Sequence, residues 1–214
     1  MEKTPHSINR VDYLFCGGGA SATLLLMKLE KSGIINNKKI VVIDPDEKSK
    51  NDKTYCFWSK EEEEPASNCK HLISHKWNKV SINRRAPESL NAEAYCHISG
   101  LSLYDELRRI ANRHSIEIIL GKAEKIEKTK EGVIVYTSEN AWLADYVFDS
   151  RPPLYKPLSE EDVHLTQSFL GYVIELTGNT CNPDCVELMD FDVEQNGFTQ
   201  FVYTLPFESN RLLV

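Results

Sequence analysis

A glycine-rich turn near the N-terminus limits the possible folds more than any other part of this sequence. Residues 17–22 read Gly-Gly-Gly-Ala-Ser-Ala and follow a nearly continuous apolar run over residues 11–16. Such a run is typical of a parallel strand buried on both faces. Residues 20–31 then have the pattern of a helix, and a second apolar run, residues 40–43, leads to Asp44. Strand, glycine turn, helix and strand together predict a complete β-α-β unit.

The small residues of this turn fit the pattern G-x-G-x-x-G/A, in which each has its own purpose. Gly17 allows the tight turn, Gly19 lets backbone N–H groups approach a pyrophosphate, and Ala22 lets the helix pack closely on the strand. The helix begins at Ala20, so its positive end points at that phosphate. Asp44 ends the second strand, where a carboxylate can bind ribose hydroxyls. The pattern therefore predicts a dinucleotide site, and the alternative is a glycine-rich turn of some other α/β protein.

The same residues leave the dinucleotide open between FAD and NAD. An acid at Asp44, rather than an arginine, disfavours the 2′-phosphate of NADP at this position. A helix predicted from Ser102 to about His114 is followed by short strands and a hairpin turn at residues 129–132. Glutathione-reductase-like flavoproteins carry a β-meander at this place in the fold, and this analogy favours FAD.

Beyond residues 152–153, both proline, the pattern changes to strand-like segments without long helices between them. This change predicts a second, mainly antiparallel β domain. We therefore expect an α/β protein with a Rossmann-like FAD/NAD(P)-binding domain over residues 1–153, a polar insertion around 46–93, and a partial substrate-binding domain over 154–214. Because the sequence stops within an apolar strand, we expect it to be truncated at the C-terminus.

Composition excludes several other classes. The net charge of -7 disfavours nucleic acid as a partner. The first ten residues lack the apolar core of a signal peptide, and no stretch approaches the roughly 20 apolar residues of a membrane span. We expect a cytoplasmic protein with reduced cysteines, and peripheral contact with the inner face of the membrane stays open. We expect no metal, because Cys69 with His71 and His75, and Cys181 with Cys185, lack further ligands.

Several segments, in order along the chain, resemble the lycopene beta-cyclase family. Residues 51–58 read Asn-Asp-Lys-Thr-Tyr-Cys-Phe-Trp and are similar to that family's signature NDRTWCFW. Two departures stand out: Tyr55 replaces a tryptophan, and Gly100 stands where many related flavoproteins carry a phosphate-clamping arginine. Arg151 is an alternative clamp, unless it pairs with a neighbouring aspartate, Asp149 or Asp145. The other matching segments are residues 12–21, 43–45, 148–152, 167–175, 188–191 and 203–207.

The resemblance implies an enzyme that converts the linear ends of lycopene into beta-ionone rings without net redox change. It also implies reduced FAD as cofactor and NAD(P)H as electron donor. Protonation of a terminal double bond needs a general acid in a dry, apolar tunnel. The family's key glutamate would follow Val214, and Asp190 and Glu175 are further candidates, with ordinary strand carboxylates as the alternative reading. Another FAD-dependent isoprenoid reductase or monooxygenase, or a fragment that only binds nucleotide, stays open.

Overall fold

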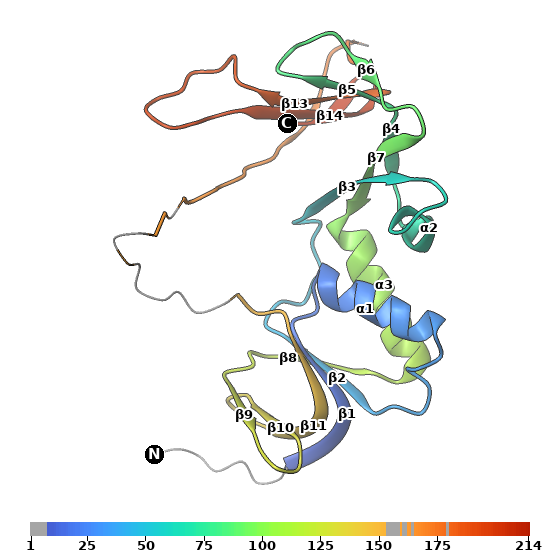
Figure 1. The fold of residues 1–214 in the computed structure, drawn as a ribbon, viewed down its shortest axis with the longest axis vertical. Helices are drawn as coiled ribbons and strands as arrows, with labels where there is room; N and C mark the ends of the chain where they lie inside the picture. The colour runs from blue at the N-terminus through green and yellow to red at the C-terminus, as the bar shows by residue number, and fades with distance from the viewer. Residues whose placement is uncertain (1–7, 153–158, 160–161, 164, 179) are drawn as a thin grey trace. The chain divides into compact units, whose positions relative to one another are not determined.

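The computed structural model describes residues 8–152, 159, 162–163, 165–178 and 180–214. The chain divides into two compact units, each built from two separate stretches (Figure 1). Unit 1 comprises residues 1–53 and 100–155, and unit 2 comprises residues 54–99 and 156–214. The domain boundary expected between residues 153 and 154 lies outside the described residues.

Unit 1 is built on a six-stranded sheet in the order β8-β2-β1-β11-β10-β9. The strands β8, β2, β1 and β11 are mutually parallel, whereas β9, β10 and β11 form an antiparallel meander. This is the expected Rossmann-like arrangement with its meander. Its elements are β1 (Ile8–Cys16), α1 (Ala20–Lys31), β2 (Ile40–Asp44), α3 (Gly100–His114), β8 (Glu117–Leu120), β9 (Lys125–Lys128), β10 (Val133–Tyr136) and β11 (Ala141–Asp149).

The sheet of unit 1 is covered on both faces, which explains why every residue of β2 is buried. Alternate residues of one strand point to opposite faces, so Val42 joins one core cluster and Val41 the other. The first cluster packs the sheet against α1 and α3, through residues such as Leu26 and Ile110. The second lies on the face of the meander, around Trp142. Two buried faces account for the unbroken apolar runs of β1 and β2.

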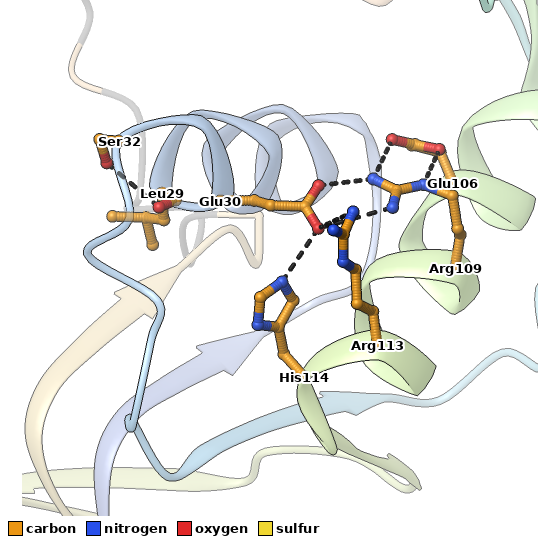
Figure 2. Close-up of polar contacts among 7 residues, drawn as sticks. All are labelled: Leu29, Glu30, Ser32, Glu106, Arg109, Arg113 and His114. Atoms are coloured by element: carbon orange, nitrogen blue, oxygen red, sulfur yellow. Dashed lines mark hydrogen bonds and ion pairs between the residues drawn. The ribbon is translucent and has the colours of Figure 1, made fainter.

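Helices α1 and α3 lie side by side and are joined by an ion-pair network around Glu30 (Figure 2). The Glu30 carboxylate accepts hydrogen bonds from Arg109 Nη2 at 2.5 Å and His114 Nε2 at 2.9 Å, and Arg113 Nη1 lies 3.7 Å away. Arg109 also donates from Nε to Glu106 at 2.8 Å. The hydrogen bond from Arg109 holds the pKa of Glu30 below its usual value. The network therefore fixes α3 against α1 at the end remote from the glycine turn.

Unit 2 contains a six-stranded sheet in the order β12-β15-β14-β13-β5-β6 and a three-stranded sheet in the order β3-β7-β4. All of its strand pairs are antiparallel except β13 with β5. Its elements are β3 (Thr54–Lys60), α2 (Ala66–Cys69), β4 (His75–Trp77), β5 (Lys79–Ile82), β6 (Glu88–Ser89), β7 (Glu93–Ser99), β12 (Val173–Glu175), β13 (Cys185–Asp190), β14 (Val202–Glu208) and β15 (Arg211–Leu213). The second domain is thus mainly antiparallel β, as expected.

The polar insertion around residues 46–93 differs from expectation in the unit to which it belongs. It contains β3, α2, β4, β5 and β6. The insertion was assigned to the first domain, whereas its residues 54–99 fold with unit 2. The reason is a long-range parallel pairing, in which Lys79 of β5 lies opposite Cys185 of β13. The insertion therefore supplies two strands, β5 and β6, to the six-stranded sheet of unit 2 and is not an extension of unit 1.

A buried aromatic cluster forms the core of unit 2. Trp77 is completely buried, and its Nε1–H donates to the Pro206 carbonyl at 2.8 Å. His97 is also buried, with its ring 4.9 Å from that of Phe207. Its Nδ1 shares a hydrogen bond of 2.6 Å with Ser74 Oγ. An imidazole in such a place is held neutral, because burial lowers the pKa of His97 from 6.5 to about 4.

Unit 2 is expected to lose stability as the pH falls. Between pH 6.5 and pH 4 the unfolded chain binds a proton at His97 that the folded state excludes, so acid favours unfolding. The free energy of unfolding should fall by about 1–2 kcal/mol between pH 7 and pH 5. Urea unfolding at the two pH values measures this difference. His97→Gln should remove most of it and the exposed control His71→Gln should retain it; the reverse order would contradict the assignment.

Candidate functional site

The turn after β1 requires a glycine at position 17. Gly17 has φ +111°, a backbone conformation that other residues rarely adopt, and its N–H donates to the Ile43 carbonyl at 2.8 Å. A Cβ added to Gly17 would lie 2.2 Å from Ser150 Oγ, which itself donates to the Cys16 carbonyl. The ends of β1, β2 and β11 therefore converge on this residue, and only hydrogen fits there.

Gly19 meets a different environment, because it faces open space. It is the N-cap of α1 in extended conformation, and an added Cβ would find no atom within 4 Å. The first N–H groups of a helix have no partner within the helix, and α1 has no acidic side chain in its first turn. Ala20 begins the helix and Ala22 is buried behind it. These features leave room for a phosphate at a helix end that attracts anions.

Asp44 stands at the end of β2 with its carboxylate held by the neighbouring backbone. The side chain is buried, Oδ2 accepts from Gly18 N–H at 2.6 Å, and Oδ1 accepts from Asp46 N–H at 2.8 Å. Lys48 Nζ lies 3.4 Å from Oδ1. The predicted ribose ligand is therefore connected to the glycine turn by a direct hydrogen bond. Each carboxylate oxygen has two lone pairs, so both keep capacity for a further donor.

A cavity of about 260 Å³ lies beside Asp44, where β2 and β8 end. Its size approaches the roughly 300–1,000 Å³ typical of small-molecule sites. Ligands of open α/β sheets bind outside the carboxyl ends of the strands, which is where this cavity lies. The turn, Asp44 and the cavity thus form one continuous candidate site. The lining residues are Gly18, Val42, Asp44, Asp46, Glu47, Lys48, Tyr104, Leu107, Arg108, Ile118, Ile119 and Leu120.

Arg151 follows β11 and is held by protein groups. Its Nε and Nη2 donate to the Asp149 carboxylate at 2.8 and 2.9 Å, and Nη1 donates to the Ala123 carbonyl at 2.6 Å. The hydrogen bond from Arg151 holds the pKa of Asp149 below its usual value. Asp145 instead pairs with Arg10. The structural pairing with Asp149 is therefore present, and a phosphate contact by Arg151 stays a prediction.

The two candidate acids of unit 2 lie on different strands and differ in environment. Asp190 is buried, and its Oδ2 accepts from Arg84 Nε at 2.8 Å. Glu175 is exposed on β12, opposite Arg211 of β15. In the sheet, β14 and β15 lie between the strands of the two acids. Asp190 and Glu175 are therefore not a paired acid and base on neighbouring strands.

The sequence matches the family described as "Lycopene cyclase protein" over residues 12–214. The match takes in the glycine turn, Asp44 and nearly all of both units. The chain belongs to the lycopene cyclase family. The resemblance seen in the sequence is thereby confirmed. A comparison with curated proteins found no match.

Solved structures share the fold at low sequence identity. A geranylgeranyl bacteriochlorophyll reductase-like protein from Thermoplasma acidophilum has a TM-score of 0.63 and 12% identity, covering 97% of this chain and 56% of its own length. The p-nitrophenol 4-monooxygenase PnpA from Pseudomonas putida DLL-E4 has a TM-score of 0.56 and 11% identity, covering 96% and 58%. A mutant of NikD, an unusual amino acid oxidase essential for nikkomycin biosynthesis, has a TM-score of 0.57 and 10% identity, covering 96% and 68%.

The chain therefore spans little more than half the length of the first two of these proteins. The likeness confirms the Rossmann-like fold class. In the part of the chain that the structure describes, no helix is long and apolar enough to cross a membrane. Within those same residues, no group of three or more His, Cys, Asp or Glu side chains is placed to hold a metal ion.

The beginning of the family signature anchors α3. Asn51 Oδ1 accepts from Leu101 N–H at 3.2 Å, and the Lys53 carbonyl accepts from Gly100 N–H at 2.8 Å. These contacts start α3 at Gly100, two residues before the predicted Ser102 start. A Cβ added to Gly100 would lie 2.9 Å from the Lys53 carbonyl oxygen. This close crossing leaves no room for a side chain at position 100.

Sequence reasoning overlooked Arg84 and Lys48 as site residues. Arg84 lies 106 positions from its partner Asp190. A single sequence carries no signal for such a pairing. Lys48 is four residues after Asp44, in the polar insertion, and its proximity to that carboxylate depends on the backbone conformation of residues 45–48.

Proposed function

We propose that this chain is an FAD-binding carotenoid cyclase that converts the linear ends of lycopene into beta-ionone rings. The observation that carries the proposal is the open face of Gly19 beside the buried Asp44 carboxylate, in a chain that belongs to the lycopene cyclase family. The ring closure is an isomerisation, in which a proton adds to a terminal double bond and another proton is lost. The proposal includes NAD(P)H as the donor that keeps FAD reduced.

The residues of unit 1 fit a flavin dinucleotide. The N-terminal end of α1 and the N–H groups after Gly19 would bind the diphosphate, and Asp44 would accept hydrogen bonds from the ribose. Within the proposal, Arg151 would approach the phosphates only by giving up contacts to Asp149 or Ala123. Reduced anionic flavin, when bound, would stabilise positive charge on the substrate electrostatically. The protein's part in this site is to hold the dinucleotide and exclude water.

The proton donor must be a carboxyl group that stays protonated near neutral pH, which requires an apolar environment without a cationic partner. Asp190 does not meet this condition, because its carboxylate is paired with the Arg84 guanidinium. Glu175 does not meet it either, because its side chain is exposed to water rather than enclosed by apolar groups. We therefore assign Asp190 an orienting or electrostatic role rather than that of the proton donor. Val214 itself pairs with Tyr172 through two backbone hydrogen bonds.

A cluster of aromatic rings in unit 2 supports a polyene substrate. Phe201 contacts Phe169, Phe191 and Tyr203, with ring centroids 5.4–6.4 Å apart. Phe169 is 69% exposed and Phe191 37% exposed. Exposed apolar groups gathered in this way mark binding surfaces for apolar molecules. Because lycopene is itself apolar, the proposal includes peripheral contact with a membrane surface, by a protein that works on the cytoplasmic side.

Pigment analysis tests the reaction directly. The gene is expressed in cells that accumulate lycopene. The extracted carotenoids are separated by chromatography, and their molecular masses are determined by mass spectrometry. The proposal expects a product of unchanged mass with one or two closed rings. A gain of hydrogen would instead identify an isoprenoid reductase, and a gain of oxygen a monooxygenase. Unchanged lycopene with FAD bound would identify a chain that only binds nucleotide.

Asp44→Ala is expected to reduce the flavin that remains bound after purification by about tenfold or more, since hydrogen bonds to a charged group are lost. The change also leaves Gly18 N–H and Asp46 N–H without their acceptor, at a cost of about 1–3 kcal/mol in stability. Flavin absorbance per protein measures the effect. Asp145→Ala, which removes only an exposed ion pair with Arg10, is the control. Equal flavin in both variants would count against the ribose contact.

A further inference from the structure

Lys48 lines the candidate nucleotide cavity, although nothing in the glycine-turn pattern points to it. Its ammonium group is 3.4 Å from Asp44 Oδ1 and 5.4 Å from the ring centroid of Tyr104. The side chain is 22% exposed. A cation placed between a carboxylate and an aromatic face is attracted by both, which fixes its position. Lys48 therefore touches two walls of the cavity at once.

The backbone of Lys48 is held as firmly as its side chain. Its residue has a positive φ of 55°, and its N–H donates to Asp46 Oδ1 at 2.6 Å. Arg108 Nη2, from α3, donates to the Lys48 carbonyl through a short hydrogen bond and to the Glu47 carbonyl at 3.4 Å. The loop after β2 is thus attached to α3, and the direction of the Lys48 side chain is set by the fold of unit 1.

Tyr104 connects this arrangement to the family signature. The ring is almost completely buried and lines the cavity, and its hydroxyl donates to Asp52 Oδ1 at 3.0 Å. Asp52 belongs to the segment whose neighbours, Asn51 and Lys53, hold the start of α3. A continuous path of contacts therefore runs from Asp52 through Tyr104 and Lys48 to Asp44, and from there to the N–H of Gly18.

We propose that Lys48 and Tyr104, with Asp52 behind them, are positioning residues that orient the Asp44 carboxylate toward the ribose 2′-hydroxyl of a bound adenine dinucleotide. This inference rests on the proposed function, since it assigns residues to the same site. Lys48 and the Asp46 N–H hold one carboxylate oxygen while Gly18 N–H holds the other, so the plane of the carboxylate is set from two sides. Asp52 fixes the Tyr104 ring on which Lys48 rests.

The test compares the binding of ADP and 2′-deoxy-ADP to the whole chain by calorimetric titration. The wild-type chain should prefer ADP by about tenfold or more, because the charged carboxylate accepts from the 2′-hydroxyl. Lys48→Met should bring this preference close to one, and Lys48→Arg should restore most of it. Tyr104→Phe, which cuts the link to Asp52, should reduce the preference by about threefold or more. Lys50→Met removes an exposed lysine of the same loop and should leave the preference unchanged.

The outcomes separate the inference from the function on which it rests. A wild-type chain that binds neither ADP nor FAD overturns the proposed function, and the inference falls with it. If the wild-type chain prefers ADP over 2′-deoxy-ADP and the Lys48→Met variant shows the same preference, only the positioning role is overturned. A Lys48→Met variant that binds both ligands more weakly by the same factor also overturns it, because a purely structural role weakens both. Loss of the preference with recovery in Lys48→Arg supports it.

Discussion

Replacing Gly17 with alanine is expected to lower the free energy of unfolding by about 2–4 kcal/mol. A residue with a Cβ is strained at φ +111°. The new methyl group would also lie 2.2 Å from Ser150 Oγ. Ser150 can rotate away only by losing its hydrogen bond to the Cys16 carbonyl. Urea unfolding of the purified variant, followed by circular dichroism, measures the loss.

Gly19→Ala is the matched control, since it adds the same methyl group two residues along the turn. Its φ of -84° suits any residue, and the added Cβ meets no atom within 4 Å. We expect the free energy of unfolding to change by less than about 1 kcal/mol, because the only cost is that alanine is a poorer N-cap residue than glycine. We assign Gly17 to close packing in the turn and Gly19 to leaving room for a ligand. A Gly19→Ala variant that unfolds as readily as Gly17→Ala would contradict this assignment.

Trp77→Ala is expected to lower the free energy of unfolding of unit 2 by about 3–5 kcal/mol. The side chain is completely buried and its indole N–H donates to the Pro206 carbonyl. Removing it leaves a cavity lined by Val186, Leu188 and Leu205, and leaves a buried carbonyl without its donor. Chemical unfolding with urea again provides the measurement.

Trp58 offers the control for this prediction, because it is the tryptophan of the family signature and is 45% exposed. Its ring packs at a tilt against Tyr95 with centroids 4.4 Å apart, so Trp58→Ala should cost no more than about 1–2 kcal/mol. A larger loss at Trp58 than at Trp77 would show that the signature tryptophan, rather than the β4 tryptophan, holds the core of unit 2.

The nucleotide-binding half of the fold could be predicted because its signals are local. The helix expected over residues 20–31 is α1, Ala20–Lys31. The hairpin expected at residues 129–132 is closed by a hydrogen bond from Thr129 N–H to the Gly132 carbonyl. These signals are small residues at fixed spacing and short continuous apolar runs. Each lies within a few consecutive residues, so a single sequence is enough to recognise it.

The parts that could not be predicted depend on pairings between distant segments. Strand β3 contains the short run Tyr55-Cys56-Phe57-Trp58, but it is flanked by polar segments, leaves most of its residues partly or fully exposed and lacks the alternation of a half-buried strand. The parallel pairing of β5 with β13 joins residues about 106 positions apart, and it transfers the insertion to unit 2. Asp190 was recognised as a candidate, but its environment depends on Arg84, which belongs to that same insertion.

The measurement that most directly tests this account is a titration of the purified chain with FAD, followed by flavin fluorescence or calorimetry. The wild-type chain is compared with Gly19→Val, whose side chain would occupy the open space at the start of α1. We expect saturable binding by the wild type and binding at least about tenfold weaker by the variant, with melting temperatures within about 4 °C of each other. FAD binding that is unchanged by Gly19→Val, or absent from the wild-type chain, would contradict the nucleotide site.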